Sequence, residues 1–157
     1  MSTLAPIIKQ HSFFSGLDDE TIDVVTGCAK NVRFEEGTVM ARQGDPANEF
    51  FLIREGRIAV SFPAPQGGGL TIQTIDADDI VGWSWLMPPY EWQFDIIAVQ
   101  PVRALAFDGK CMRAKCEQDT ELGYELMKRL SRIMVSRLQA TRLQLLDLYG
   151  NNRPAQT

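Results

Sequence analysis

Histidine and cysteine are scarce in this sequence. Its 157 residues include one histidine, His11, and three cysteines, Cys28, Cys111 and Cys116. A single histidine excludes a histidine-rich metal site and leaves one possible base for Ser-His-Asp chemistry, so we expect a packing or surface role for it. The cysteines are odd in number and form no C-x-x-C pair. We therefore expect free thiols in a reducing compartment, with neither a disulfide nor a metal site.

Long hydrophobic runs are also missing. No apolar run approaches the roughly 18 to 20 residues that cross a bilayer, and residues 1–11 lack the basic flank and apolar stretch of a secretory signal. With 45% apolar and 23% charged residues, the composition is that of an ordinary soluble domain. We expect one cytoplasmic domain over residues 1–157, without a membrane partner.

The net charge of −4 is unevenly distributed. Residues 1–109 carry 7 Lys and Arg against 15 Asp and Glu, whereas residues 110–157 carry 9 against 5. The basic residues of the second part alternate with Leu, Met and Gln at helical spacing, which indicates a solvated helix face rather than an arm for nucleic acid. A local gap is more informative, because no Lys or Arg occurs between Arg57 and Arg103.

The first two thirds of the chain read as a short helix followed by strands. Asp18 precedes apolar residues at Ile22, Val25 and Ala29, a spacing that predicts a short helix with Asp18 as its N-cap. From residue 32 to residue 107, short apolar runs and alternating patterns are separated by Gly, Pro and Asp turns. This pattern of short strands and turns predicts a small all-β barrel or jelly roll, with residues 67–69 as a hairpin loop.

The last third of the chain is predicted to be helical. No Gly or Pro occurs between Tyr124 and Tyr149, so we expect one helix of about 30 residues that begins near Asp119 and ends at a polar tail, residues 150–157. Its first half has an apolar face that can dock on the barrel, formed by Leu122, Leu126, Leu130 and Ile133.

A second apolar face of the same helix follows a heptad repeat. We call it the heptad seam, and it consists of Met127, Met134, Leu138, Thr141, Leu145 and Leu148. An apolar face that continues past its own domain needs a partner, so we expect a homodimer through this helix. The alternative is that the seam packs on its own barrel.

The glycine-rich turns and their flanking apolar residues resemble the cyclic nucleotide-binding domain family, which includes the sensor domains of catabolite activator protein-type regulators. The matching residues are Phe14-Ser15-Gly16-Leu17, Gly37, Val39, Gln43-Gly44-Asp45-Pro46-Ala47, Ile53, Glu55-Gly56 and Val60. The resemblance spans about residues 13–149, with the N-terminal helix and β-roll at 13–109 and the C-terminal helices at 110–149. It implies a mainly β fold, a double-stranded β-helix (jelly-roll) barrel with flanking helices and a long C-terminal dimerisation helix.

The resemblance also implies a ligand site. The family carries a phosphate-binding cassette, G-E-[LI]-[AG]-L followed by R-[ST]-A, in which a helix N-terminus and an Arg face the cyclic phosphate and Glu accepts the ribose hydroxyl. The corresponding cassette segment here is residues 79–96. Gly82 and Leu86 match, but Trp83 stands at the Glu position, Trp92 falls near the Arg, and Asp95 falls near the Ser or Thr.

These replacements predict a diverged pocket. No Lys or Arg lies in the cassette segment, so an anion bound there would meet Glu91 and Asp95. We therefore expect the family's ligands, cyclic AMP and cyclic GMP, to bind weakly or not at all. Five aromatic residues fall within twelve positions of this segment, Trp83, Trp85, Tyr90, Trp92 and Phe94. They fit either a pocket remade for a small planar or apolar ligand or a pocket plugged by its own tryptophans.

Thr141 on the long helix matches a family residue that touches adenine, and it also belongs to the heptad seam. The candidate ligand-binding residues are therefore Gly82, Trp83, Ser84, Trp85, Leu86, Trp92, Asp95 and Thr141.

The sequence thus predicts a stand-alone, homodimeric sensor or regulatory module and not an enzyme, because no acid, base and nucleophile set surrounds the pocket. The alternatives are a ligand-free adaptor for a protein partner and the sensor half of a transcription regulator. Family regulators continue into a helix-turn-helix domain of about 70 residues. Since residues 151–157 alone follow the long helix, we expect no DNA binding by this chain by itself.

Overall fold

The computed structural model describes residues 4–63 and 69–151 of the chain. Two short helices open it, α1 (Ala5–Gln10) and α2 (Asp19–Thr26), with a 3-10 helix η1 (Ser12–Phe14) between them. Eight strands follow: β1 (Ala29–Phe34), β2 (Val39–Ala41), β3 (Glu49–Glu55), β4 (Arg57–Pro63), β5 (Gly69–Asp76), β6 (Ile80–Val81), β7 (Asp95–Ala98) and β8 (Val102–Asp108). Two helices close the chain, α3 (Gly109–Gln118) and α4 (Thr120–Asn151).

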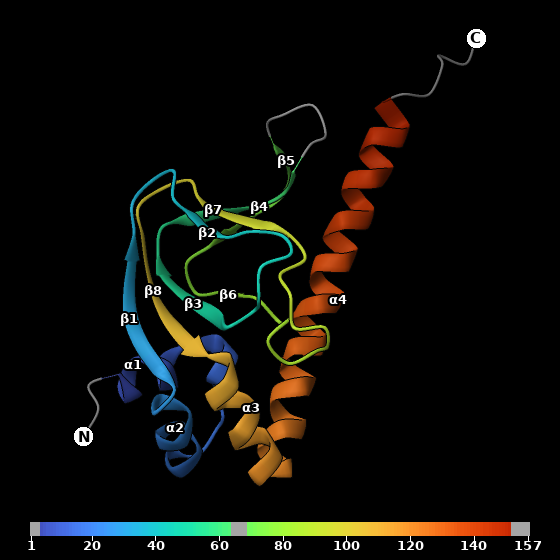
Figure 1. Cartoon of the computed structure of the whole chain (residues 1–157). Coiled ribbons are helices and arrows are strands. Elements are labelled where there is room, and N and C mark those ends of the chain that lie inside the picture. The colour runs from blue at the N-terminus through green and yellow to red at the C-terminus, as the bar shows by residue number, and fades with distance from the viewer. Residues whose placement is uncertain (1–3, 64–68, 152–157) are drawn as a thin grey trace.

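The strands form two four-stranded antiparallel sheets, in the orders β1-β8-β3-β6 and β2-β7-β4-β5. Figure 1 shows the two sheets facing each other, with the helices gathered at one end of the barrel and along its side. The predicted mainly β jelly-roll fold with flanking helices is therefore confirmed. Of the predicted hairpin loop, Gly69 begins β5, and residues 67 and 68 lie outside the described residues.

Strand β3 is covered on both faces, and this explains why the molecule has two hydrophobic clusters. Successive side chains of a strand point to opposite faces. Phe50 and Leu52 accordingly pack in the cluster that contains the helices, whereas Phe51 and Ile53 pack between the two sheets. All four are at most 3% exposed. A continuous apolar run such as residues 50–53 is what a strand buried on both faces requires.

The predicted N-cap of the N-terminal helix is confirmed. The Asp18 carboxylate accepts a hydrogen bond from the Thr21 N–H at 2.8 Å and begins α2, whose Ile22 and Val25 are buried. The predicted third helical position is wrong, because Ala29 begins β1 after the helix has ended at Thr26.

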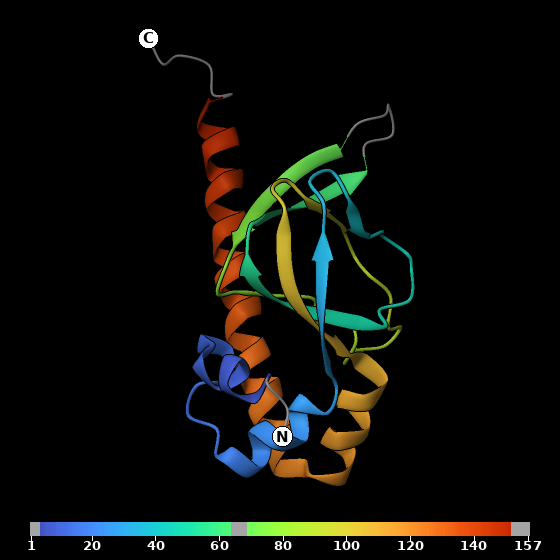
Figure 2. The same ribbon diagram turned by 90° about the vertical axis from the view of Figure 1, so that its left-hand side faces the viewer.

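The long C-terminal helix, coloured orange to red in Figures 1 and 2, extends beyond the barrel. Its first half docks through Leu122, Leu126 and Leu130, which are at most 4% exposed. From residue 141 to residue 150 every side chain is exposed, including Leu145 and Leu148 of the heptad seam at 62%. The predicted stop at Gly150 is slightly early, since α4 includes Gly150 and Asn151, and residues 152–157 lie outside the described residues.

The expectation of three free thiols is wrong for two of them. Cys28 and Cys111 form a disulfide with an S–S distance of 1.99 Å, and Cys116 is free. The two cysteines are 83 positions apart in sequence, so no local spacing reveals the pair. The sheet brings them together, because Ala29 of β1 pairs with Phe107 of β8 and the bonded cysteines lie just beyond this pair.

Breaking this disulfide should destabilise the domain. Reduction with dithiothreitol is expected to lower the free energy of unfolding by about 2 to 4 kcal/mol, because the bond restricts the unfolded chain between distant residues. Urea denaturation with and without reductant measures the effect. The double variant Cys28→Ser/Cys111→Ser is the control, since it should not respond to reductant; an unchanged wild-type midpoint on reduction would show that the bond is absent.

Candidate functional site

A cavity of about 350 Å³ lies between the second sheet, the cassette segment and α4, and we call it the main cavity. The sheet contributes Val60, Phe62, Ile72, Gln73 and Ile96, the cassette segment contributes Val81, Gly82, Trp83, Ser84, Trp92, Gln93 and Phe94, and α4 contributes Met134, Arg137, Leu138 and Thr141. Most of these side chains are apolar. Among the described residues that line the cavity, Arg137 is the one charged group.

Five of the eight residues predicted to bind ligand line the main cavity. They are Gly82, Trp83, Ser84, Trp92 and Thr141. Their roles toward a ligand stay predictions, but the structure brings them together from the cassette segment and from α4.

The other three predicted residues lie elsewhere. Trp85 is 1% exposed and stacks on Phe50 in the cluster that contains the helices, and Leu86 packs against the same cluster. The Asp95 carboxylate accepts a hydrogen bond from the Gln43 N–H at 2.8 Å and so fastens the loop after β2. Sequence position alone could not separate Trp85 and Leu86 from their cavity-lining neighbours, because consecutive residues of an irregular loop point in different directions; Asp95 is the first residue of β7.

The backbone of the cassette segment departs from the family design. Residues 84–89 form turns, with the Leu86 N–H donating to the Trp83 carbonyl at 3.1 Å and the Met87 N–H to the Ser84 carbonyl at 3.4 Å. A helix N-terminus presents free N–H groups to an anion. Residues 79–96 all belong to the described part of the chain, and no helix begins among them.

Trp92 forms part of the inner wall of the main cavity without filling it. Its backbone is held by the Gly44-Asp45 turn, since its N–H donates to the Asp45 carbonyl at 2.9 Å and its carbonyl accepts from the Gly44 N–H at 2.8 Å. Its ring is 7% exposed and stacks on Phe51 at 6.2 Å. The cavity remains beside it, so of the two interpretations of the aromatic residues the structure favours an open pocket.

Arg137 is the functional candidate that the sequence reasoning missed. Its side chain is 14% exposed, its Nη2 lies 3.5 Å from Asp79 Oδ1, and the same nitrogen donates to the Ile80 carbonyl. The guanidinium also lies 5.3 Å from the centre of the Trp83 ring, within the range of a cation–π contact. Burial lowers the pKa of Arg137, and the Asp79 carboxylate opposes that shift, so the group stays protonated.

A helical signal for Arg137 was available in the sequence. It precedes Thr141 by four residues, which places both side chains on one face of α4, and the Thr141 hydroxyl donates to the Arg137 carbonyl at 2.9 Å. The stretch between Arg57 and Arg103 contains no Lys or Arg, so a search near the cassette segment does not find Arg137, which reaches the cavity from α4. Glu91 and Asp95, which we expect an anion in the cassette to meet, do not line the main cavity.

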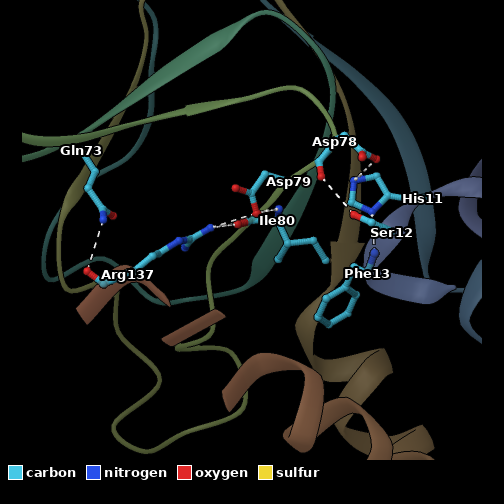
Figure 3. Close-up of polar contacts among 8 residues, drawn as sticks. All are labelled: His11, Ser12, Phe13, Gln73, Asp78, Asp79, Ile80 and Arg137. Carbon is cyan, nitrogen blue, oxygen red and sulfur yellow. Dashed lines mark hydrogen bonds and ion pairs between the residues drawn. The ribbon is translucent and has the colours of Figure 1, made fainter. Parts of the chain in front are cut away.

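A second hollow of about 220 Å³ lies between the residues after α1 and the middle of α4, and Asp79 lines it. Figure 3 shows Asp79 between Arg137 on one side and the residues around His11 on the other. His11 lies in the same hollow, 6% exposed. Its Nδ1 accepts a hydrogen bond from the Phe13 N–H at 3.1 Å, and its Nε2 lies 3.6 Å from Asp78 Oδ1. Burial lowers the pKa of His11, and Asp78 and Asp79 oppose the shift. His11 therefore has the expected packing role, as the cap of η1.

Comparison with known proteins agrees with this arrangement. The family model described as "Cyclic nucleotide-binding domain" matches residues 31–119, more than half of the chain, so the chain belongs to the cyclic nucleotide-binding domain family.

Individual relatives show how far the similarity extends. The chain is 23% identical over 148 residues to a CRP-like cAMP-activated global transcriptional regulator of Mycobacterium tuberculosis, covering 94% of this chain and 64% of the regulator. The chain thus spans somewhat less than two thirds of that relative.

Solved structures share the fold. A cyclic nucleotide-binding domain from Methylobacillus flagellatus matches with a TM-score of 0.77 at 16% identity, covering 98% of this chain and 85% of that chain. The regulatory subunit of a cAMP-independent protein kinase A from Trypanosoma brucei matches with a TM-score of 0.73 at 20% identity, covering 93% and 50%. The described residues hold no helix apolar enough to cross a membrane and no cluster of side chains suited to a metal ion.

Gly82 is required where the cassette segment passes Trp92. Its φ is 105°, and an added Cβ would lie 2.8 Å from Trp92 Cη2. Gly82→Ala should lower the free energy of unfolding by about 3 kcal/mol, through backbone strain and overpacking together, and should change the near-ultraviolet circular dichroism of tryptophan. Gly37→Ala is the matched control, because its φ of 88° imposes the strain while nothing lies within 4 Å of the added Cβ. Equal losses in the two variants would contradict the assigned contact.

Proposed function

We propose that this domain is a regulatory sensor module whose main cavity binds a small, planar and largely apolar ligand, and which binds cyclic AMP and cyclic GMP weakly or not at all. The observation that carries the proposal is the wall of the cavity, in which aromatic and aliphatic side chains surround about 350 Å³ and one charged side chain enters from α4. Ligand pockets of small molecules have this composition and start at about 300 Å³.

The residues and backbone of the cassette segment support the proposal that cyclic nucleotides bind weakly or not at all. Trp83 stands where the family has the Glu that accepts the ribose hydroxyl, residues 84–89 form turns, and no cation is present between Arg57 and Arg103. Loss of a charge-assisted phosphate contact in a semi-buried pocket costs about 2 to 5 kcal/mol, or roughly 30-fold or more in affinity. Arg137 is not an equivalent of that cation, because it comes from α4 rather than from the cassette segment and its Nη2 is already engaged by Asp79 and the Ile80 carbonyl, which leaves Nη1 alone for a ligand.

A non-enzymatic role fits the same cavity. The described residues that line it include no His, Cys, Lys, Asp or Glu, so Ser84 and Thr141 have no neighbouring general base within the cavity. A nucleophile without a base is weak at its ordinary pKa. We therefore propose ligand-dependent regulation rather than catalysis.

We further propose that the module is a homodimer that pairs through the heptad seam of α4. Leu138, Leu145 and Leu148 are 52% to 62% exposed, which is unusual for a row of leucines on one helix face. Leu138 and Thr141 belong both to the seam and to the cavity wall. A ligand that contacts this wall can bias how the two helices pair, and this would transmit the signal.

The proposed location is the cytoplasm. Cellular reductants there keep most cysteines as thiols, so the Cys28–Cys111 pair would spend part of its time reduced. Both cysteines also pack in the helical cluster that contains Phe14 and Leu126, so this apolar packing would remain in the reduced form.

Cyclic nucleotide titration tests the proposed ligand preference. At 1 mM cyclic AMP or cyclic GMP, the unfolding temperature should rise by less than about 2 °C, because a Kd near or above that concentration contributes at most about 0.4 kcal/mol. Thermal unfolding and tryptophan fluorescence both report on this, since Trp83 and Trp92 line the cavity. Micromolar binding would overturn the proposal, and no binding by either cyclic nucleotides or planar apolar compounds would favour the ligand-free adaptor.

Light scattering tests the dimer. Leu145→Glu places a charge within the heptad seam and should convert a dimer into a monomer, halving the mass. Leu143→Glu is the matched control, because Leu143 is similarly exposed, at 65%, but lies on the opposite face of the heptad. A monomeric wild type, or an equal effect of the two substitutions, would contradict pairing through this seam.

A further inference from the structure

Among the described residues, those on the wall of the main cavity include one positive group and no negative group. Asp79, the ion partner of Arg137, does not line this cavity, and its side chain is 48% exposed. Water screens an exposed carboxylate far better than it screens a group inside an apolar cavity. A molecule within the cavity therefore meets the charge of Arg137 more strongly than that of Asp79.

Part of the Arg137 guanidinium is unused. Its Nη2 forms the ion pair with Asp79 and donates a hydrogen bond to the Ile80 carbonyl (Figure 3). Within residues 4–63 and 69–151, no hydrogen bond uses the hydrogens on its Nη1. Nη1 is not among the fully buried unpaired polar atoms of these residues, so it keeps access to water and remains open to an incoming acceptor. An acceptor that reaches Nη1 from the cavity would bind its hydrogens without displacing Asp79.

We propose that the ligand is an aromatic monocarboxylate, with its carboxylate on Nη1 of Arg137 and its ring among Trp83, Trp92 and Phe94. This inference rests on the proposed function and names the class of ligand. One negative charge matches the single cation, whereas a dianion would bring an unpaired charge into an apolar space. Aromatic side chains favour a planar partner by stacking and edge contacts. The volume of about 350 Å³ suits one or two fused rings.

The polar groups around Arg137 hold it in the position that this ligand needs. Gln73 Nε2 donates to the Arg137 carbonyl at 3.3 Å, and the Thr141 hydroxyl donates to the same carbonyl. Asp79 in turn accepts from the Ile80 N–H at 2.8 Å, so the ion partner is itself fixed by the backbone. Gln73 and Thr141 thus contact the helix backbone that carries Arg137, and Asp79 with the Ile80 carbonyl holds the guanidinium itself before a ligand arrives, which lowers the entropy lost on binding.

A matched pair of probes tests the inference by isothermal titration calorimetry on the intact chain. The acid is 2-naphthoate, and 2-naphthalenemethanol has the same ring system without the charge. The acid should bind about tenfold or more tightly than the alcohol. Arg137→Gln should abolish this preference while changing alcohol affinity less than about twofold. Arg132→Gln is the control, because Arg132 is an exposed arginine of the same helix outside the main cavity, and it should keep the preference.

Two further variants keep the test decisive if Arg137→Gln proves unstable. Asp79→Asn removes the competing charge and should tighten acid binding severalfold without affecting the alcohol, whereas Arg137→Lys should retain part of the preference. Equal binding of acid and alcohol by the wild type would overturn the carboxylate assignment and leave the proposed apolar-ligand sensor standing. Binding of neither probe overturns the inference too. Micromolar binding of cyclic AMP would instead overturn the proposed function.

Discussion

The contact of Arg137 with Asp79 and the Ile80 carbonyl is the interaction on which the functional site depends. It fastens α4 to the start of the cassette segment, 57 positions away in sequence, and it gives the main cavity its charge. The hydrophobic docking of Leu122, Leu126 and Leu130 fixes the first half of α4. Beyond these leucines, the arginine and the cavity wall are what keep the helix against the barrel before its exposed end begins.

The cassette segment shows how a ligand site changes its chemistry while the fold is kept. The barrel turns at Gly44 and Gly56 have positive φ, and the two sheets form a jelly roll that superposes on a solved cyclic nucleotide-binding domain with a TM-score of 0.77. The side chains that face the cavity include Trp83 and Trp92, where the resemblance predicts polar family residues. Backbone geometry and site chemistry are separable because the sheets support the cassette segment through buried residues such as Phe50 and Phe51, which lie outside the main cavity.

Local signals in the sequence predicted the local elements of this structure. The Asp18 cap, the apolar run of β3 and the absence of Gly and Pro in α4 each act through neighbouring residues, so composition and spacing were sufficient. The Cys28–Cys111 bond and the entry of Arg137 into the cavity depend on which strand lies beside which helix, and spacing cannot report this. The place of Trp85 follows from the course of an irregular loop, which has no periodicity to read. The role of Asp95, at the start of β7, depends on its contact with Gln43, which is 52 positions away in sequence.

The negative end of a ligand in the main cavity should lie on Nη1 of Arg137. A crystal structure of the domain with 2-naphthoate tests it most directly. We predict a carboxylate within hydrogen-bonding distance of Nη1 of Arg137, a ring between Trp83 and Phe94, and an unbroken contact between Arg137 and Asp79. Density for the carboxylate at the cassette turns around Ser84, away from Arg137, or a cavity closed by the tryptophan rings would contradict the account.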